Sequence, residues 1–210
     1  MTVLVVGTGN PGKLREIQAY FEDEHSDWAL ELKPADFDVE ETGTTFLENA
    51  ALKASETAIA TGQWAIADDS GLSVEALDGA PGIFSARYGT DDNDRISRLL
   101  RELGETSNRA AKFVCAIAVA NPDGHIVILE EGVCLGEILL TPQGTDGFGY
   151  DPVFYVPEES MTFAEMNDEV KHHVSHRGRA FEMVMPKLTA LGLKLRKERK
   201  ERWGNPDHFV

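Results

Sequence analysis

The stretch "TVLVVGTGNPGKL", residues 2–14, joins an apolar run to a glycine-rich turn, and a helical pattern follows it. The apolar run is short and rich in β-branched residues, which is typical of a buried strand. After Pro11, apolar residues recur at helical spacing through Phe21. A buried strand that enters a helix through such a turn predicts an α/β fold.

The glycine-rich turn fits two phosphate-binding patterns at once. Residues 7–12 match G-x-G-x-x-G, and residues 7–13 match the P-loop pattern G-x-x-x-x-G-K. A dinucleotide fold needs an acidic residue at the end of the second strand, whereas Glu31 lies inside a strand pattern. A P-loop needs Ser or Thr for magnesium at the position of Leu14. Neither pattern is complete, and a turn that binds no ligand is the alternative.

Lys13 favours a phosphate-binding turn. It stands in the first turn of the predicted helix, where the helix dipole disfavours a cation and favours an anion. A local rule broken without structural gain often marks function. We therefore expect Asn10 and Lys13 to bind phosphate, with magnesium held elsewhere.

Two acidic segments are candidates for that magnesium. Asp68 and Asp69 follow the apolar run 64–67, and α/β sheets bind ligands at the carboxyl ends of strands. Adjacent strand residues point to opposite faces, so we expect one of the two aspartates to reach the site. "EET" at 40–42 adds two carboxylates, and magnesium typically takes one or two together with substrate phosphates. Lys53 is an exposed helix lysine unless a partner lies close in space.

The rest of the chain continues the alternation of strands and helices. Thr45 and Glu48 form a capping-box pattern that opens one helix, Gly62 closes it, and Ser175 is expected to cap the last. The segment 121–124 is a turn signal between two long strand patterns. These signals predict a mixed sheet in a single domain over 1–210. We expect strands at 3–7, 28–33, 64–67, 111–120 and 125–140, and helices at 13–24, 46–61, 94–103 and 175–191.

Composition narrows the function. Lys and Arg number 20 against 36 Asp and Glu, and the net charge of −16 argues against nucleic-acid partners. No apolar run is long enough to span a membrane, and the N-terminus has no signal-peptide pattern, so we expect a cytoplasmic protein. Cys115 and Cys134 both fall in strand patterns and are expected to be reduced core residues.

Five motifs occur in the order of one known family: "TGNPGK" with Glu16, the segment 40–54, "ADDSGLSVEALDGAPGIFSARY" at 67–88, "GFGYDPVF" at 147–154 and "SHRGRAF" at 175–181. To about residue 192 the chain resembles the inosine triphosphate pyrophosphatase family, also called dITP/XTP pyrophosphatases. The resemblance implies an elongated mixed sheet flanked by helices in two lobes, with the active cleft between them. It also implies a homodimer that uses Mg²⁺ to hydrolyse ITP, dITP and XTP to the monophosphate and pyrophosphate.

The resemblance also assigns the site residue by residue. It implies Asp69 as proton acceptor and, together with Glu41, as metal ligand. No counterpart, and hence no role, is implied for the tail 193–210. The implied substrate-binding residues are Thr8, Gly9, Asn10, Pro11, Gly12, Lys13, Lys53, Ser70, Phe148, Gly149, Tyr150, Asp151, Lys171, His176 and Arg177.

The motif at 175–181 supports a base pocket independently. His176, Arg177 and Arg179 crowd the first turn of a helix, the unfavourable end for cations. Donors there would match the 6-oxo group of hypoxanthine and leave the 6-amino group of adenine unpaired. The alternative is a cationic turn that is exposed and compensated by nearby acids. Zinc binding by the histidines of 172–176 is not expected, since the sequence offers no second cluster of ligands.

Three other classes stay open at this point. A Maf-like enzyme would apply similar chemistry to pyrimidine or modified nucleotides. A nucleotide-sensing protein would bind without turnover, and a nicotinamide oxidoreductase would explain the glycine pattern at 7–12.

Overall fold

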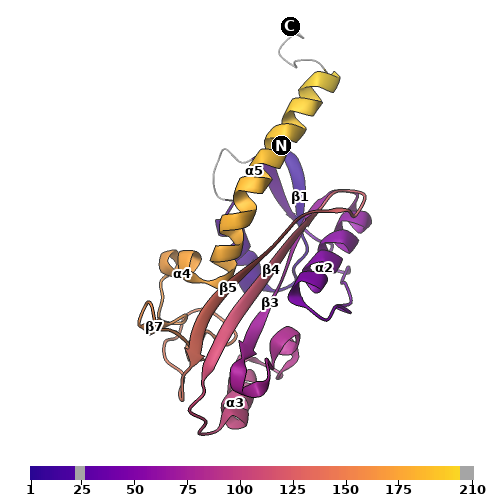
Figure 1. Cartoon of the computed structure of the whole chain (residues 1–210). Coiled ribbons are helices and arrows are strands. Elements are labelled where there is room, and N and C mark those ends of the chain that lie inside the picture. The colour runs from indigo at the N-terminus through magenta and orange to yellow at the C-terminus, as the bar shows by residue number, and fades with distance from the viewer. Residues whose placement is uncertain (22–26, 204–210) are drawn as a thin grey trace.

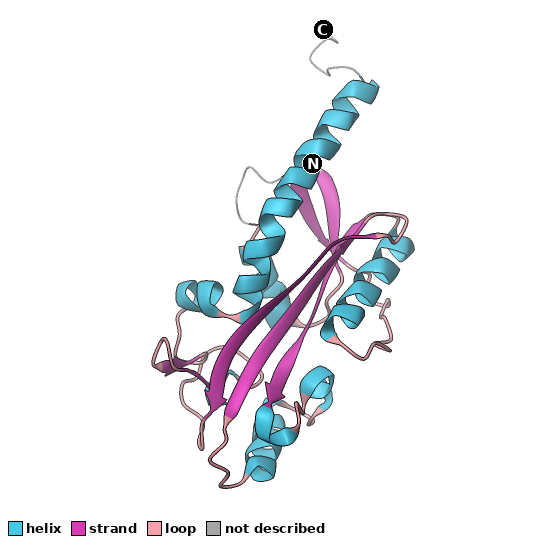
Figure 2. Cartoon of the chain, viewed as in Figure 1, coloured by secondary structure: helices cyan, strands magenta, loops and turns pink. Residues whose placement is uncertain are grey.

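The computed structural model describes residues 1–21 and 27–203. Its centre is a seven-stranded sheet in the order β2-β1-β3-β4-β5-β6-β7 (Figures 1 and 2). The first three of these strands pair in parallel and the others antiparallel, so the predicted α/β fold on a mixed sheet is confirmed. The strands are β1 (Thr2–Val6), β2 (Trp28–Leu32), β3 (Trp64–Val74), β4 (Ala110–Ala120), β5 (Ile126–Ile138), β6 (Phe154–Val156) and β7 (Met161–Thr162).

In the part of the chain that the structure describes, five helices and three short 3-10 turns surround the sheet. The α-helices are α1 (Pro11–Ala19), α2 (Phe46–Thr61), α3 (Asp92–Leu103), α4 (Asp168–Val174) and α5 (His176–Trp203). The 3-10 turns are η1 (Glu75–Leu77), η2 (Gly82–Arg87) and η3 (Asp151–Val153). No helix of the described ranges is long and apolar enough to cross a membrane.

Helices cover both faces of the long strands, and Figure 1 shows α2 and α5 on opposite sides of them. One face packs against α2, whose fully buried Ala50, Ala54 and Ala58 form a small-residue stripe at a spacing of four. That stripe meets strand alanines such as Ala65 and Ala116, so the helix lies close to the sheet. The opposite face packs under α1 and α5, around residues such as Ile117. This layering puts the start of α1 and the start of α5 over the same part of β3.

Strand β3 is longer than the sequence predicts. We expected it to end at Ala67, whereas it continues to Val74 because it pairs with β4 over ten residues. Asp68 and Asp69 therefore lie inside a strand. They still lie at a carboxyl end, because the parallel neighbour β1 stops where Val6 pairs with Ile66. The polar residues of β3 begin where β1 no longer covers that edge.

Other expectations differ in detail. The first helix ends at Ala19 and not at 24, and 22–24 lie outside the described residues. Thr45 caps α2 as predicted, and the Glu48 carboxylate accepts from the Thr44 amide at 2.6 Å. The cap by Ser175 is confirmed, since its hydroxyl accepts from the Gly178 amide at 3.1 Å.

The hairpin of β4 and β5 is confirmed, and so is the core position of Cys115 and Cys134, which are buried with free thiols. Helix α4 was not predicted. Helix α5 runs past the predicted end at 191 to Trp203, so most of the predicted tail is helix, and 204–210 lie outside the described residues. Figure 1 shows this end of α5 projecting beyond the sheet.

Candidate active site

The glycine-rich turn runs from β1 into α1 and is capped by its own asparagine. The Asn10 side chain accepts hydrogen bonds from the Gly12 and Lys13 amides at 2.8 and 3.1 Å. Pro11 has no amide proton to offer. The first-turn N–H groups that we expected to attract an anion are thus already satisfied. The positive charge that this turn contributes comes from the Lys13 side chain.

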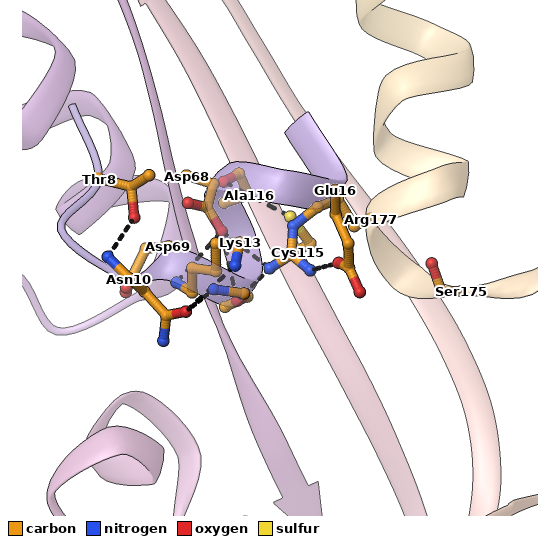
Figure 3. Close-up of polar contacts among 12 residues, drawn as sticks. Thr8, Asn10, Lys13, Glu16, Asp68, Asp69, Cys115, Ala116, Ser175 and Arg177 are labelled. Carbon is orange, nitrogen blue, oxygen red and sulfur yellow. Dashed lines mark hydrogen bonds and ion pairs between the residues drawn. The ribbon is translucent and has the colours of Figure 1, made fainter. Parts of the chain in front are cut away.

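Asp68 gathers the cations on one face of β3 (Figure 3). Its Oδ2 lies 3.1 Å from Lys13 Nζ and 3.0 Å from Arg177 Nη2, and that same nitrogen donates to Ser70 Oγ at 3.0 Å. Asp68 and Arg177 are both almost completely buried. Burial alone would raise the pKa of Asp68, but Lys13 and Arg177 hold it well below its ordinary value. This carboxylate stays charged and fixes two cations that the sequence could only place on separate helices.

Glu16 extends the cluster along α1. It pairs with Arg177 and with Lys171 Nζ, the latter at 2.8 Å, and Lys171 also binds Asp151 Oδ2 at 2.7 Å. The Asp151 carboxylate in turn accepts from the Phe148 amide at 2.9 Å. The base-binding segment predicted at 148–151 is therefore joined to α1 and α4 by one chain of charged contacts.

On the other face of β3, Asp69 lies against α2 and the preceding loop. Lys53 Nζ donates to Asp69 Oδ1 at 3.0 Å and to Glu41 Oε1 at 2.7 Å, so one ammonium bridges the two carboxylates. The amide of Asn49 lies 3.3 Å from Asp69 Oδ2, and Arg87 pairs with the outer oxygen of Glu41 at 3.0 Å. Burial raises the pKa of Asp69 above its ordinary value, against the opposing charge of Lys53. We expected only one of Asp68 and Asp69 to reach the site. Instead, Asp68 pairs with Lys13 and Asp69 pairs with Lys53, on opposite faces of β3.

The donor set on this face suits a magnesium ion. Asp69 and Glu41 already converge on a cation, the Lys53 ammonium, and both supply the hard oxygen ligands that Mg²⁺ takes. No group of three or more His, Cys, Asp or Glu side chains in 1–21 and 27–203 forms a self-sufficient metal site. Two protein carboxylates together with substrate phosphates make up the usual magnesium environment at phosphoryl-transfer sites.

A pocket of about 270 Å³ opens on the Asp68 face. It is lined by every predicted substrate-binding residue except Thr8, Gly9 and Lys53. A larger pocket of about 550 Å³ lies on the other side of Phe148, but it lacks Lys13, Ser70 and Arg177. The smaller pocket is the better candidate site, because it joins the phosphate turn to the cations and to the 148–151 segment.

Phe148 lines both pockets, and so do Gly12, Arg15 and Lys171. A Cβ atom at position 12 would lie 2.7 Å from the Phe148 ring, so the turn needs glycine there. The ring also lies 5.0 Å from Lys171 Nζ. Phe148 therefore has tight packing contacts of its own as well as a place in the pocket wall.

His176 and Arg177 begin α5 inside the protein. The ring of His176 is stacked on Phe113 with centroids 4.6 Å apart, and its Nδ1 has no hydrogen-bond partner among the described residues. Burial and the neighbouring Arg177 lower the pKa of His176 well below its ordinary value. His176 and Arg177 are thus buried, with Arg177 compensated by acids, whereas Arg179 stays partly exposed beside Glu158.

Several polar residues of the site were missed. Asp68 was considered and then assigned no role, and Glu16 appeared only as part of a motif. Its helical spacing of three from Lys13 was the signal that could have placed it on the same face. Arg95 lines the pocket, and Asn49 contacts Asp69. Neither residue has a sequence signal that sets it apart from an ordinary helix residue. Their positions depend on contacts between segments far apart in the chain.

Comparison with known proteins gives one consistent relationship. The sequence model of the Ham1 family matches residues 4–187. A dITP/XTP pyrophosphatase from Nostoc is 61% identical over 189 residues, which is 90% of this chain and 95% of the relative, and one from Synechocystis is 55% identical over 88% and 94%. The structure of a HAM1 protein from Coxiella burnetii superposes with a TM-score of 0.82 at 41% identity, over 90% of this chain and all of that one. The chain belongs to the Ham1 family.

Proposed function

We propose that this protein hydrolyses the deaminated purine nucleoside triphosphates ITP, dITP and XTP to the nucleoside monophosphate and pyrophosphate. The activity removes these nucleotides from the pool. Relatives that carry the name dITP/XTP pyrophosphatase are 49–61% identical to this chain. The observation that carries the proposal is the pair of charged clusters on the two faces of β3, one of which lines the smaller pocket with Lys13 and Arg177.

Hydrolysis of the bond between the α- and β-phosphates needs water to attack phosphorus while pyrophosphate leaves. Such a reaction depends on positioning and charge neutralisation more than on covalent chemistry. Lys13 and Lys53 come from opposite sides of β3 and are each oriented by an aspartate. In the proposed mechanism they neutralise the leaving pyrophosphate. Ser70 and the turn at 8–12 hold the remaining phosphate oxygens.

Asp69 is the proposed proton acceptor that orients the attacking water. Burial raises its pKa, and a carboxylate with a raised pKa is a stronger base towards water. Asp69 and Glu41 would hold Mg²⁺, which would neutralise phosphate charge and acidify bound water. Lys53 keeps these two carboxylates together in the free protein.

The proposed base pocket is formed by 148–151 with Lys171, His176 and Arg177. Two guanidinium nitrogens of Arg177 are engaged by Glu16, Asp68 and Ser70, and its buried Nε has no partner among the described residues. A 6-oxo purine can accept from donors in such a pocket, whereas adenine would leave them unpaired.

The remaining properties follow the family resemblance. We propose a single domain over 1–210 that works as a cytoplasmic homodimer with Mg²⁺. With a net charge of −16, nucleic acid is not a proposed partner. Two of the alternatives considered from the sequence differ in what they would do with a nucleotide: a Maf-like enzyme would prefer pyrimidines, and a sensor would bind without turnover.

The test is pyrophosphate release from dITP, dATP, dGTP and dUTP, each with magnesium and with EDTA. We expect magnesium-dependent release, fastest with dITP. Asp69→Asn should lose most turnover while circular dichroism stays that of the wild type. Preferred release from dUTP would support the Maf-like alternative. Binding without release from any of the four would leave a nucleotide-binding protein.

A further inference from the structure

Asn49 is a buried polar side chain that the mechanism above does not use. It lies in the first turn of α2 with 1% of its surface exposed, next to the alanine stripe that packs on the sheet. Asn49 and Lys53 are four residues apart, so they lie on the same side of the helix, and both reach Asp69. A buried amide is retained at such a position only if its hydrogen bonds are made.

The orientation of that amide is determined by its contacts. Asn49 Oδ1 accepts from the Gly43 backbone amide at 2.8 Å, so Nδ2 is the atom that faces Asp69 Oδ2, at 3.3 Å. Lys53 occupies the other oxygen, Oδ1. Both oxygens of Asp69 therefore meet donors from α2, one neutral and one charged.

Gly43 connects Asn49 to the second carboxylate. It follows Glu41 by two residues, in the loop that leads into α2. A Cβ atom at position 43 would lie 2.6 Å from Asn49 Oδ1 and 2.7 Å from the Cβ of Glu48. The backbone of this loop thus packs directly against the Asn49 amide, two residues after Glu41.

We propose that Asn49 is a positioning residue that sets the relative orientation of Asp69 and Glu41 for a shared divalent cation, an inference that rests on the proposed function. Lys53 also bridges the two carboxylates, but its ammonium neutralises them. The Asn49 amide holds Asp69 through a neutral donor, so the negative charge of the carboxylate remains available to the cation. Partners behind metal ligands commonly change metal affinity about 10- to 100-fold when they are removed.

The experiment compares Asn49→Ala, Gly43→Ala and a matched control, Glu48→Gln. Glu48 binds Thr44 in the same loop, at the exposed end of α2, and does not contact Asp69. Calorimetry measures Mn²⁺ binding to each protein without nucleotide. Pyrophosphate release from dITP then gives the Mg²⁺ concentration for half-maximal rate, and KM at saturating Mg²⁺. Thermal unfolding checks that each variant is folded.

We expect Asn49→Ala to weaken Mn²⁺ binding about tenfold or more, to raise the Mg²⁺ requirement by a similar factor and to leave KM near that of the wild type. Gly43→Ala should shift both metal measurements in the same direction, and Glu48→Gln should not. If Asn49→Ala does not fold, Gly43→Ala decides.

The proposal is overturned if folded Asn49→Ala, or Gly43→Ala when that variant decides, keeps the wild-type Mn²⁺ affinity and the wild-type Mg²⁺ requirement. If the wild-type protein binds no Mn²⁺ without nucleotide, the Mg²⁺ requirement alone decides. Failure of the wild-type enzyme to hydrolyse dITP would contradict the proposed function instead, and the Mn²⁺ comparison would still decide the role of Asn49.

Discussion

Arg177 enters the protein at the start of α5 with 2% of its side chain exposed, and it contacts Glu16 and Asp68 there. Burial alone would lower the pKa of Arg177, but these two acids keep the guanidinium charged. The sequence predicted that His176, Arg177 and Arg179 lie in the first turn of this helix, but it did not predict which groups they contact. The structure shows that the nearest charges are the protein's own carboxylates.

We predict that Arg177→Ala lowers the free energy of unfolding by about 3–5 kcal/mol, because the buried Asp68 would keep only Lys13 as a cationic partner and Glu16 only Lys171. Urea unfolding measures the loss. Lys197→Ala is the control, since Lys197 forms only an exposed pair with Glu201 on α5 in the described structure and should cause a much smaller loss. Equal losses in the two variants would contradict a special role for the buried pairs. Nucleotide preference of Arg177→Ala should therefore be measured under conditions in which the variant is folded.

At the residue scale, the sequence identified the segments of the site better than the contacts within it. Lys13 was singled out because it breaks the dipole rule, and it does lie in the pocket. Its partner Asp68 is 55 positions away, and no local pattern links the two. Asn10 was expected to bind phosphate, yet its side chain caps α1, a role that its position before Pro11 also allowed. Local rules describe what a residue can do, whereas the partner depends on how the elements pack.

At the element scale, α3 and the glycine-rich segment 147–151 are joined by one carboxylate. Asp92 Oδ2 accepts from the Gly149 amide at 2.7 Å, and Asp92 Oδ1 binds Arg95 at 2.5 Å. Gly149 has a positive φ of 64°, so this loop takes a backbone shape that other residues resist. The first turn of α3 therefore helps to hold the proposed base-binding segment in place.

We predict that Asp92→Ala raises KM for dITP about tenfold, because a hydrogen bond to a charged group contributes about 1.5–3 kcal/mol and its loss frees the loop. The Mg²⁺ concentration for half-maximal rate should stay unchanged, since Asp92 contacts neither Asp69 nor Glu41 in the described structure. Steady-state kinetics at saturating Mg²⁺ gives KM. The control is Asp94→Ala, whose carboxylate binds only the exposed Thr90 turn in the described structure and should leave KM near wild type. An unchanged KM in Asp92→Ala would remove this role.

The helices and strands with strong periodic patterns were predicted well. Where a strand ends, however, depended on its hydrogen-bond pairing with the neighbouring strand. The hairpin and the capped helix α2 are as expected, because each has a turn or cap with a defined chemistry. β3 extends beyond its apolar residues because it pairs with β4 over ten residues. This pairing outweighs the low strand propensity of "DDSG" at 68–71. α5 continues through Pro186, which a local rule would treat as a break.

At the scale of the whole molecule, the site's charges nearly cancel. One cluster pairs Lys13, Lys171 and Arg177 with Glu16, Asp68 and Asp151, and the other pairs Lys53 with Glu41 and Asp69. The two clusters lie on opposite faces of β3 and tie it to α1, α2, α4 and α5. His176 lies beside Arg177 in the first cluster as a neutral group. Its protonation state is therefore linked to the stability of the whole fold.

We predict that the free energy of unfolding falls as pH drops below about 6.5. The folded pKa of His176 lies well below the ordinary value of 6.5, so the unfolded chain binds this proton first. The loss can reach about 1.4 kcal/mol per pH unit and should be absent above pH 7. Urea unfolding from pH 7.5 to 5 measures it. His176→Phe, which can keep the stack on Phe113, should reduce the slope. Identical slopes in the two proteins would contradict the assignment.

The alternation of side chains along β3 has a consequence for how this sequence can vary. Asp68 meets Lys13 and Arg177 on one face, and Asp69 meets Lys53 on the other, so a shift of one residue would exchange their surroundings. Insertions or deletions within β3 would turn the proposed catalytic carboxylate away from its lysine. Changes in length should therefore be tolerated only outside this strand, for example in the turn at 121–124, where β4 meets β5.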